Sequence, residues 1–328
     1  MVESLKRKTV RGMTWSFVDN IANSGITFFV GLILARLLTP MEYGIMAMIT
    51  IFIAISTSII DSGFSNALIR KSEINRIDYN TVFYFNLGVS VLLYIILYVA
   101  SPVISSFFNE SVLIKITRII SWILIINALG IIPRTILVVN IDFKTQTKVS
   151  LISSIVSGVV GVGMAFYGLG VWSLVGQQLS RQLLNTFFLW IYCRWRPVWE
   201  FSTESFREMF GFGSKLLVSG LIDTLYKNIY YVIIGHFYSS AQLGQYTRAD
   251  QFKNIFSSNL TNVIQRVSYP VLSSIQNDPK RLKDAYRRII KTTMLITFTC
   301  MIGLAAIAKS LIIVLIGEKW LQAVYFLQ

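Results

Sequence analysis

The chain has 328 residues, of which 54% are hydrophobic and only 14% are charged, with a net charge of +14 and a mean hydropathy of +0.61. A soluble domain carries about a quarter charged residues, so this composition predicts an all-α integral membrane protein. The two cysteines and the single histidine, His236, are too few for a disulfide framework, a four-ligand zinc site or most nucleophilic triads.

Long apolar segments along the chain predict about ten membrane-spanning helices, since a helix of about 20 residues crosses a hydrocarbon core of about 30 Å. The expected spans are residues 15–38, 41–60, 81–108, 112–139, 149–167, 171–193, 207–235, 243–275 and 287–308, and a tenth begins near Leu311 or Trp320. The segments between them are short, so the sequence predicts no inserted soluble domain.

Lysines and arginines are distributed unevenly between alternate loops. With the amino terminus in the cytoplasm, most of them fall on the cytoplasmic side, and large groups lie at residues 6–11 and 280–291. Arg134 is counted with one of these cytoplasmic segments. The positive-inside rule predicts this orientation, so membrane topology accounts for the net charge and no nucleic-acid partner is expected.

Two segments 200 residues apart are similar to each other. Residues 33–44 align without a gap with residues 233–244, with identical residues at both ends and similar ones between. Each segment ends the first span of a six-span block, as in a duplicated transporter. The sequence therefore predicts an N-terminal six-span lobe over residues 1–200 and a second lobe over residues 201–328 that stops in its fourth span. We expect from this that the 328 residues are a fragment and do not function alone.

Several spans carry side chains that lipid does not accommodate. A charge at the centre of a bilayer costs about 2.5–3.5 kcal/mol or more, so such groups face one another, backbone carbonyls or water. The first and seventh spans have polar faces, and these two spans together with the eighth predict a wet cavity with more positive than negative charge, which favours an anionic substrate. The eighth span carries a polar stripe at helical spacing, made of Thr247, Gln251, Asn254, Ser258, Thr261 and Gln265.

These polar groups also have structural interpretations. The stripe could serve only for hydrogen bonds between helices. Lys215 and Asp61 could lie at the membrane interface and extend toward water instead of lining a cavity. Gln178, Arg181 and Asn185 share one face of the sixth span, where packing between helices and contact with substrate are both open.

Several motifs are similar to those of one family of membrane transporters: Leu34–Pro40 with Gly44, Asp61–Ile69, Gly170–Gln178, Arg194–Pro197, Ile234–Gly235, Tyr269–Leu272 and the basic run that ends at Arg288. On these motifs the chain resembles the Wzx-type polysaccharide exporters. These are lipid-linked oligosaccharide flippases of the multidrug/oligosaccharidyl-lipid/polysaccharide superfamily, and the similarity is greatest to the colanic-acid and teichuronic-acid exporter branch. Relatives often have an acidic residue in the seventh span and an arginine after Ile-Gly. This chain has Tyr230 or Tyr231 and His236 there, so coupling roles of those positions do not carry over.

The resemblance implies a two-lobe helical transporter whose central cavity opens alternately to each side. It implies a multi-pass protein of the bacterial plasma (inner) membrane that passes undecaprenyl-pyrophosphate-linked oligosaccharide from the cytoplasmic to the outer leaflet, with no covalent chemistry and no cofactor. It leaves open a proton or sodium gradient as the energy source, and contacts with polysaccharide polymerase and export machinery.

Under this resemblance, three groups of side chains form the expected site. Those that would bind the pyrophosphate are Lys215, Lys227, Arg248, Lys253 and Arg266. Those that would bind sugar are Asn20, Asn23, Gln251, Asn254 and Gln265. Those that would balance charge or couple transport to an ion are Asp19, Asp61, Asp223 and Asp250.

Two other functions remain open. An integral-membrane enzyme acting on the same polyprenyl-linked sugar would need acids or bases in a sizeable external loop, whereas the external loops here are short. A cation-coupled multidrug exporter of the same superfamily would favour an acidic cavity, and the excess of cations within the spans argues against it.

Overall fold

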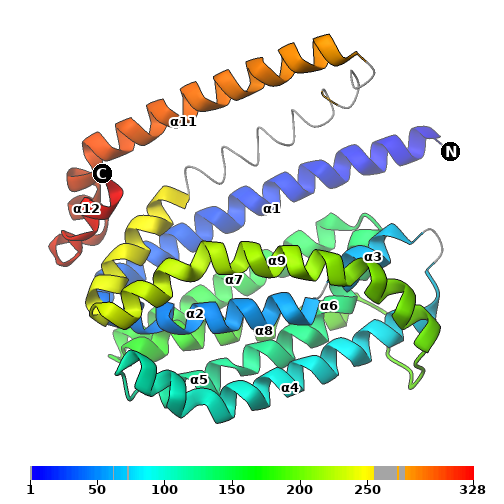
Figure 1. Cartoon of the computed structure of the whole chain (residues 1–328), viewed down its shortest axis with the longest axis horizontal. Helices are drawn as coiled ribbons and strands as arrows, with labels where there is room; N and C mark the ends of the chain where they lie inside the picture. Colours follow the sequence, from blue (N-terminus) through cyan, green and yellow to red (C-terminus); the bar gives the residue numbers. More distant parts are fainter. Residues whose placement is uncertain (1, 62, 72–73, 255–271, 273–277) are drawn as a thin grey trace.

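The computed structural model describes residues 2–61, 63–71, 74–254, 272 and 278–328. The regular secondary structure of this part of the chain is helical, without β-strands (Figure 1). Residues 240–254 form a helix between α9 and α11. The other helices are α1 (Val2–Leu37), α2 (Pro40–Asp61), α3 (Phe64–Arg70), α4 (Arg76–Phe108), α5 (Leu113–Ile120), α6 (Trp122–Val139), α7 (Phe143–Phe166), α8 (Val171–Tyr192), α9 (Thr203–Phe237), α11 (Pro279–Ile316) and α12 (Ala323–Leu327).

The expected all-helical membrane architecture is confirmed. Six helical stretches of the described chain are long and apolar enough to cross a membrane: Thr14–Leu37, Pro40–Arg70, Arg76–Phe108, Leu113–Val139, Phe143–Phe166 and Lys280–Ile316. Helices α8 and α9 match the expected sixth and seventh spans in position, but they carry polar side chains and are not among these six stretches.

One expected span is present but contains a break, and the expected tenth span differs from the structure. The expected span 112–139 is divided into α5 and α6 at Ser121, whose hydroxyl donates to the carbonyl of Thr117 at 2.6 Å. A new span does not begin at Leu311 or Trp320. Instead α11 continues through Leu311 to Ile316, and a 3₁₀ turn over Glu318–Trp320 leads into the short α12.

Local capping explains where several helices begin. Asp78 accepts the backbone N–H of Asn75 at 2.9 Å, in a capping box at the start of α4. Asp142 and Asp278 each accept a backbone N–H three residues ahead, at the starts of α7 and α11. At α11 this cap is followed by Pro279, which lacks the N–H that a first helical turn leaves unpaired.

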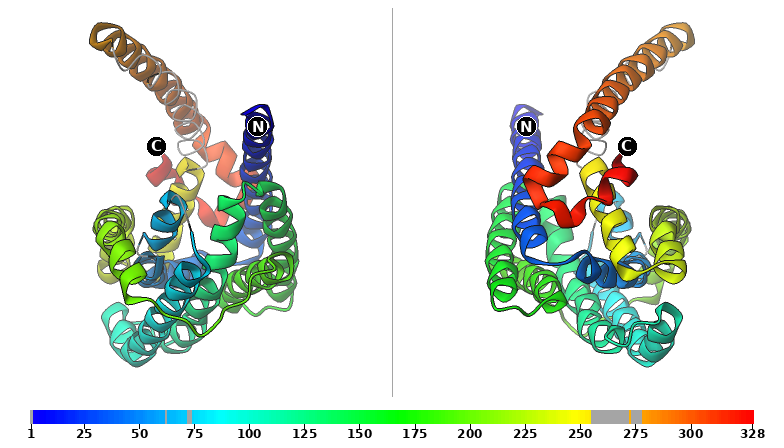
Figure 2. Two further views of the ribbon diagram at one scale, coloured as in Figure 1. Left: turned by 90° about the vertical axis from the view of Figure 1, so that its right-hand side faces the viewer. Right: turned by 90° about the vertical axis from the view of Figure 1, so that its left-hand side faces the viewer.

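The helices from α1 to α8 form one packed bundle, and α9 lies along α2 (Figure 1). The main apolar core of this bundle includes Leu34, Met48, Phe108, Ile116 and Leu174. Helix α11 projects away from the bundle, and the two end views show it apart from α4 and α9 (Figure 2). The start of α1 and the start of α11 lie toward one end of the molecule, and α12 lies at the other (Figure 1).

Two helix starts 200 residues apart are built in the same way. Before α2, the backbone N–H and the hydroxyl of Thr39 donate to Oε2 of Glu42, at 2.6 and 2.9 Å. Before the 240–254 helix, the N–H and hydroxyl of Ser239 donate to Oε1 of Gln242, at 3.3 and 3.4 Å. The segments that align in sequence therefore also share a capping arrangement.

Candidate functional site

Three neighbouring cavities lie between the helices. The large cavity, about 720 Å³, lies between α2, α3, α6 and α9. The amide pocket, about 430 Å³, lies between α6, α7 and α8. The Arg248 cavity, about 400 Å³, is lined by α1, α2, α8, α9 and the 240–254 helix. Arg134 lines the first two and Arg181 lines the last two, so the three cavities adjoin.

Arg134 and Arg181 are the cations at these junctions. The Arg134 guanidinium donates a long hydrogen bond of 3.5 Å to Oδ1 of Asn185. Asp61 attracts Arg134 and Asp19 attracts Arg181. Within the described residues, however, neither arginine forms an ion pair of 4.0 Å or less. Arg134 is half-buried and Arg181 is exposed, and two guanidinium groups that line cavities without a paired carboxylate can bind an anion.

The other expected charges of the large cavity are paired or lie outside it. Lys227 and Asp223 line the cavity as an exposed i,i+4 ion pair of 2.7 Å. Asp61 also lines it and accepts the Ser65 hydroxyl at 2.6 Å. Lys215 is exposed on α9 and is not among the described residues that line any of the three cavities.

Arg248 lies in an aromatic box. Its side chain is only 5% exposed, and its guanidinium carbon lies 3.8 Å from the ring centre of Tyr43 and 5.5 Å from that of Trp320. It also donates to Oε1 of Gln251. Arg248 and Gln251 both line the Arg248 cavity. The ring contacts nevertheless give Arg248 a packing role between Tyr43 on α2 and Trp320 in the 3₁₀ turn before α12.

Asp250 is the centre of a hydrogen-bonded cluster at the same cavity. Its carboxylate accepts the Tyr231 hydroxyl at 3.0 Å and the Asn254 amide at 2.8 Å. Lys253 pairs with its other oxygen at 2.5 Å. Asp250 and Asn254 line the Arg248 cavity, whereas the charge of Lys253 is neutralised locally.

On α1, Asn23 is used for packing between helices. It donates to Asp19 at 2.7 Å and to the Ser150 hydroxyl of α7 at 2.6 Å, and it accepts the Ser154 hydroxyl at 2.5 Å. These bonds favour the structural interpretation of this polar face. Asn20 is half-buried and is not among the described lining residues.

Part of the expected polar stripe lies outside the described residues. Arg266 and Gln265, with Ser258 and Thr261 of the same stripe, belong to the range 255–271, which the structure does not describe.

The sequence interpretation missed Arg134 as a site residue and left Arg181 open. Arg134 was assigned to a cytoplasmic segment, but it lies on α6 and lines two cavities. The available signal was its position within the expected span 112–139, five residues before its end. A charge inside an apolar span is a candidate functional group wherever it occurs.

Known proteins resemble this chain over most of its length. A family model described as "Polysaccharide biosynthesis protein" matches residues 33–325. The chain is 26% identical over 323 residues to the teichuronic acid biosynthesis protein TuaB of Bacillus subtilis (strain 168), covering 98% of this chain and 67% of TuaB. It is 22% identical over 330 residues to the lipopolysaccharide biosynthesis protein WzxC of Escherichia coli (strain K12), covering 99% of this chain and 66% of WzxC. The chain thus spans about two thirds of the length of these relatives.

Two solved transporters share the fold. The lipid II flippase MurJ in an inward closed conformation superposes with a TM-score of 0.72 at 15% identity, covering 97% of this chain and 71% of MurJ. An inward-facing multidrug resistance MATE family transporter of the MOP superfamily gives 0.68 at 13% identity, covering 93% and 75%. At these identities the likeness shows the fold alone.

Proposed function

The chain belongs to the polysaccharide biosynthesis protein family, a transport family of the MOP superfamily, and from this membership we propose that it flips a lipid-linked oligosaccharide. The cargo would be an oligosaccharide joined to undecaprenyl through a pyrophosphate. It would pass from the cytoplasmic to the outer leaflet of a bacterial plasma membrane as the central cavity opens alternately to each side.

The observation that carries this proposal is the pair Arg134 and Arg181 between adjoining cavities. A diphosphate keeps its negative charges at neutral pH, and guanidinium groups bind phosphate oxygens through paired N–H donors. Neither arginine has an ion-pair partner within 4.0 Å among the described residues, so both can accept an anion. We therefore propose that the pyrophosphate binds Arg134 on α6 and Arg181 on α8 rather than the cations expected from the sequence after residue 200.

The surroundings of the two arginines suit the rest of such a cargo. Hydroxyl and amide side chains line all three cavities and match the hydroxyls of sugars. The lipid tail can remain in the bilayer while the head group crosses. The starts of α1 and α11, where basic groups of the sequence fall, lie toward one end of the molecule (Figure 1), which supports a cytoplasmic location of that end.

The test is leaflet translocation in proteoliposomes that contain the whole protein. The probes are a labelled polyprenyl-diphosphate oligosaccharide, a polyprenol-linked sugar without the diphosphate, and an organic drug cation. We expect translocation of the first probe alone. Transport of the drug cation alone would instead support a multidrug exporter, and a new covalent product would support an enzyme.

A further inference from the structure

The amide pocket has a composition that distinguishes it from the two cavities beside it. Four carboxamide side chains contribute to its wall, from Gln146 on α7 and from Gln178, Gln182 and Asn185 on α8. None of its described lining residues is acidic, whereas the large cavity is lined by Asp61 and the Arg248 cavity by Asp250. Apart from Arg134 and Arg181 at its two junctions, the described lining residues of the pocket are therefore uncharged, and many of them can form hydrogen bonds.

Some of this hydrogen-bonding capacity is unused. The side-chain oxygen of Gln146 is buried and has no hydrogen-bond partner among the residues that the structure describes. A buried acceptor without a partner is unfavourable relative to a satisfied one, so it favours a ligand that supplies a donor. Gln182 donates to Oδ1 of Asn127, which lines the large cavity, at 3.0 Å, and this bond orients the Gln182 amide.

At the wall of the amide pocket, carboxamide side chains suit the hydroxyl groups of a sugar better than charged side chains do. A sugar hydroxyl is both a donor and an acceptor, and each carboxamide also offers both. A carboxylate would serve as an acceptor as well, but its charge would repel a diphosphate held on the neighbouring Arg134 or Arg181. An amide wall between two arginines therefore suits a neutral polyol that is covalently joined to an anion.

The size of the pocket limits how much of the cargo it holds. Its volume of about 430 Å³ lies in the range of small-molecule sites, about 300–1,000 Å³. The larger cavity of about 720 Å³ adjoins it at Arg134 and offers room for further sugars.

We propose that the amide pocket binds the sugar attached directly to the diphosphate of the lipid carrier, through hydrogen bonds between its hydroxyls and Gln146, Gln178, Gln182 and Asn185. The inference rests on the proposed function, because it assumes a polyprenyl-diphosphate cargo. It goes beyond that function by assigning the first sugar to a defined set of residues in the first six helical spans. The pocket then discriminates carriers by whether that sugar presents hydroxyls to its amides.

Binding measurements with two probes test this inference. The probes are a polyprenyl diphosphate without sugar and the same lipid with one hexose, each titrated into the whole protein in nanodiscs. We expect the wild type to bind the glycosylated probe about tenfold more tightly, the effect of one or two additional hydrogen bonds. In Gln146→Leu and Gln182→Leu, this preference should fall to near unity while the affinity for the bare diphosphate lipid stays unchanged.

The control variant is Gln322→Leu, which removes an exposed amide that lines none of the three cavities. It should keep the wild-type preference. If a variant at Gln146 fails to fold, Gln178→Leu, at a more exposed position, gives the same comparison. An undiminished preference in the folded pocket variants would overturn the inference while leaving the proposed function intact. A wild type that binds neither probe would remove the proposed function, and the inference with it.

Discussion

Gly44 and Gly244 lie at a backbone-to-backbone contact between two helix starts, and each needs to be glycine for the same reason. A Cβ atom at Gly44 would overlap the carbonyl oxygen of Ser240, and one at Gly244 would overlap that of Pro40. The contact is reciprocal, because position 44 meets 240 and position 244 meets 40. The two aligned segments of the sequence thus pack against each other about a local two-fold relation.

We expect Gly44→Ala and Gly244→Ala to destabilise the protein. Replacing glycine by alanine within a helix stabilises it by about 1 kcal/mol in the absence of a clash, but overpacking costs about 1–3 kcal/mol. The contact with a carbonyl oxygen, which cannot rotate away, places both variants at the upper end of this range or beyond. Thermal unfolding in detergent measures the effect.

Gly88→Ala on α4 is the matched control, since nothing lies within 4 Å of a Cβ added there. It should leave the melting temperature unchanged or raise it. Equal melting temperatures for Gly44→Ala and Gly88→Ala would show that the two helix starts do not pack as described.

Arg248→Lys should also lower the melting temperature, although the charge is kept. A planar guanidinium stacks on the Tyr43 and Trp320 rings, whereas an ammonium group does not reproduce that geometry. A cation–π contact contributes about 0.5–2 kcal/mol. Arg207→Lys, at an exposed position on α9, should have no effect. If the two variants unfold at the same temperature, the aromatic box does not stabilise the protein.

The Lys71 ion pairs predict a dependence of stability on alkaline pH. Lys71, outside the membrane spans, lies 3.1 Å from Asp78 and 3.0 Å from Glu208 on α9. Burial acts to lower the pKa of Lys71, but the hydrogen bonds and attraction of Glu208 and Asp78 outweigh it and leave the pKa raised above 10.5. Since the folded-state pKa exceeds the unfolded one, the stabilisation is fully present below pH 10.5 and is lost as the pH rises through the folded-state pKa.

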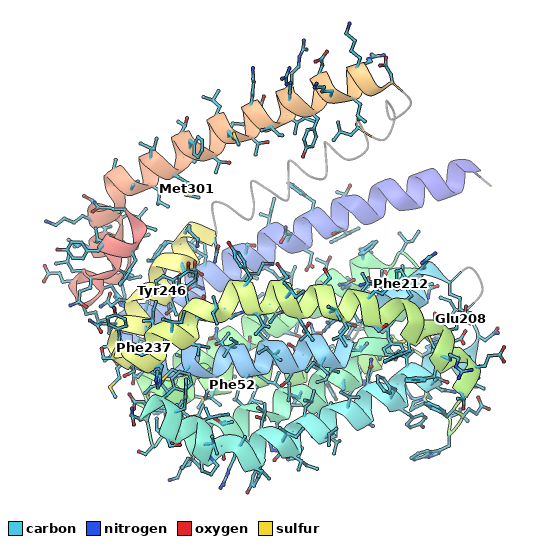
Figure 3. All side chains as sticks on the ribbon, in the orientation of Figure 1. Phe52, Glu208, Phe212, Phe237, Tyr246 and Met301 are labelled. Atoms are coloured by element: carbon cyan, nitrogen blue, oxygen red, sulfur yellow. The ribbon has the colours of Figure 1, made fainter. Side chains whose placement is uncertain are left out.

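Lys71→Met should therefore reduce the free energy of unfolding at pH 7 by about 1–3 kcal/mol, because it leaves the buried carboxylate of Asp78 without its cation. Chemical denaturation of the wild type and the variant at pH 7 and at pH 11 or above measures the difference. The two curves should converge at the higher pH, and a difference that is constant with pH would contradict this role. In Figure 3 the label of Glu208 shows where these ion pairs lie: near Phe212, at the end of the molecule opposite Phe237 and Tyr246.

The sequence predicted the helical membrane class and most helix positions, because apolar length is a strong local signal. It could not predict the break between α5 and α6 at Ser121, since neither glycine nor proline lies at or next to this residue. The similarity of segments 33–44 and 233–244 was visible in the sequence, but their shared capping and their contact at Gly44 and Gly244 appear only in the structure. The lobe boundary near residue 200 stays a prediction.

The candidate site was harder to predict because a charge in a span has the same sequence signal whether it is free, paired or stacked. Asp223 and Lys227 stand at i,i+4 spacing in the sequence, and the structure shows them as an ion pair. The aromatic partners of Arg248 come from positions 43 and 320 and cannot be read from its local sequence. Arg134 was missed because it was counted with the basic residues of a cytoplasmic segment, although it lies within the expected span 112–139 and on α6.

The most direct test of the account is the translocation rate of the polyprenyl-diphosphate oligosaccharide in proteoliposomes with Arg134→Gln, Arg181→Gln and the control Arg207→Gln. Each variant removes one guanidinium charge, but only the first two remove it from the cavities. If the pyrophosphate binds where we propose, each cavity variant slows translocation at least about tenfold, the effect of losing one charge-assisted hydrogen bond, while the control matches the wild type. Wild-type rates in both folded cavity variants would contradict a pyrophosphate site at Arg134 and Arg181.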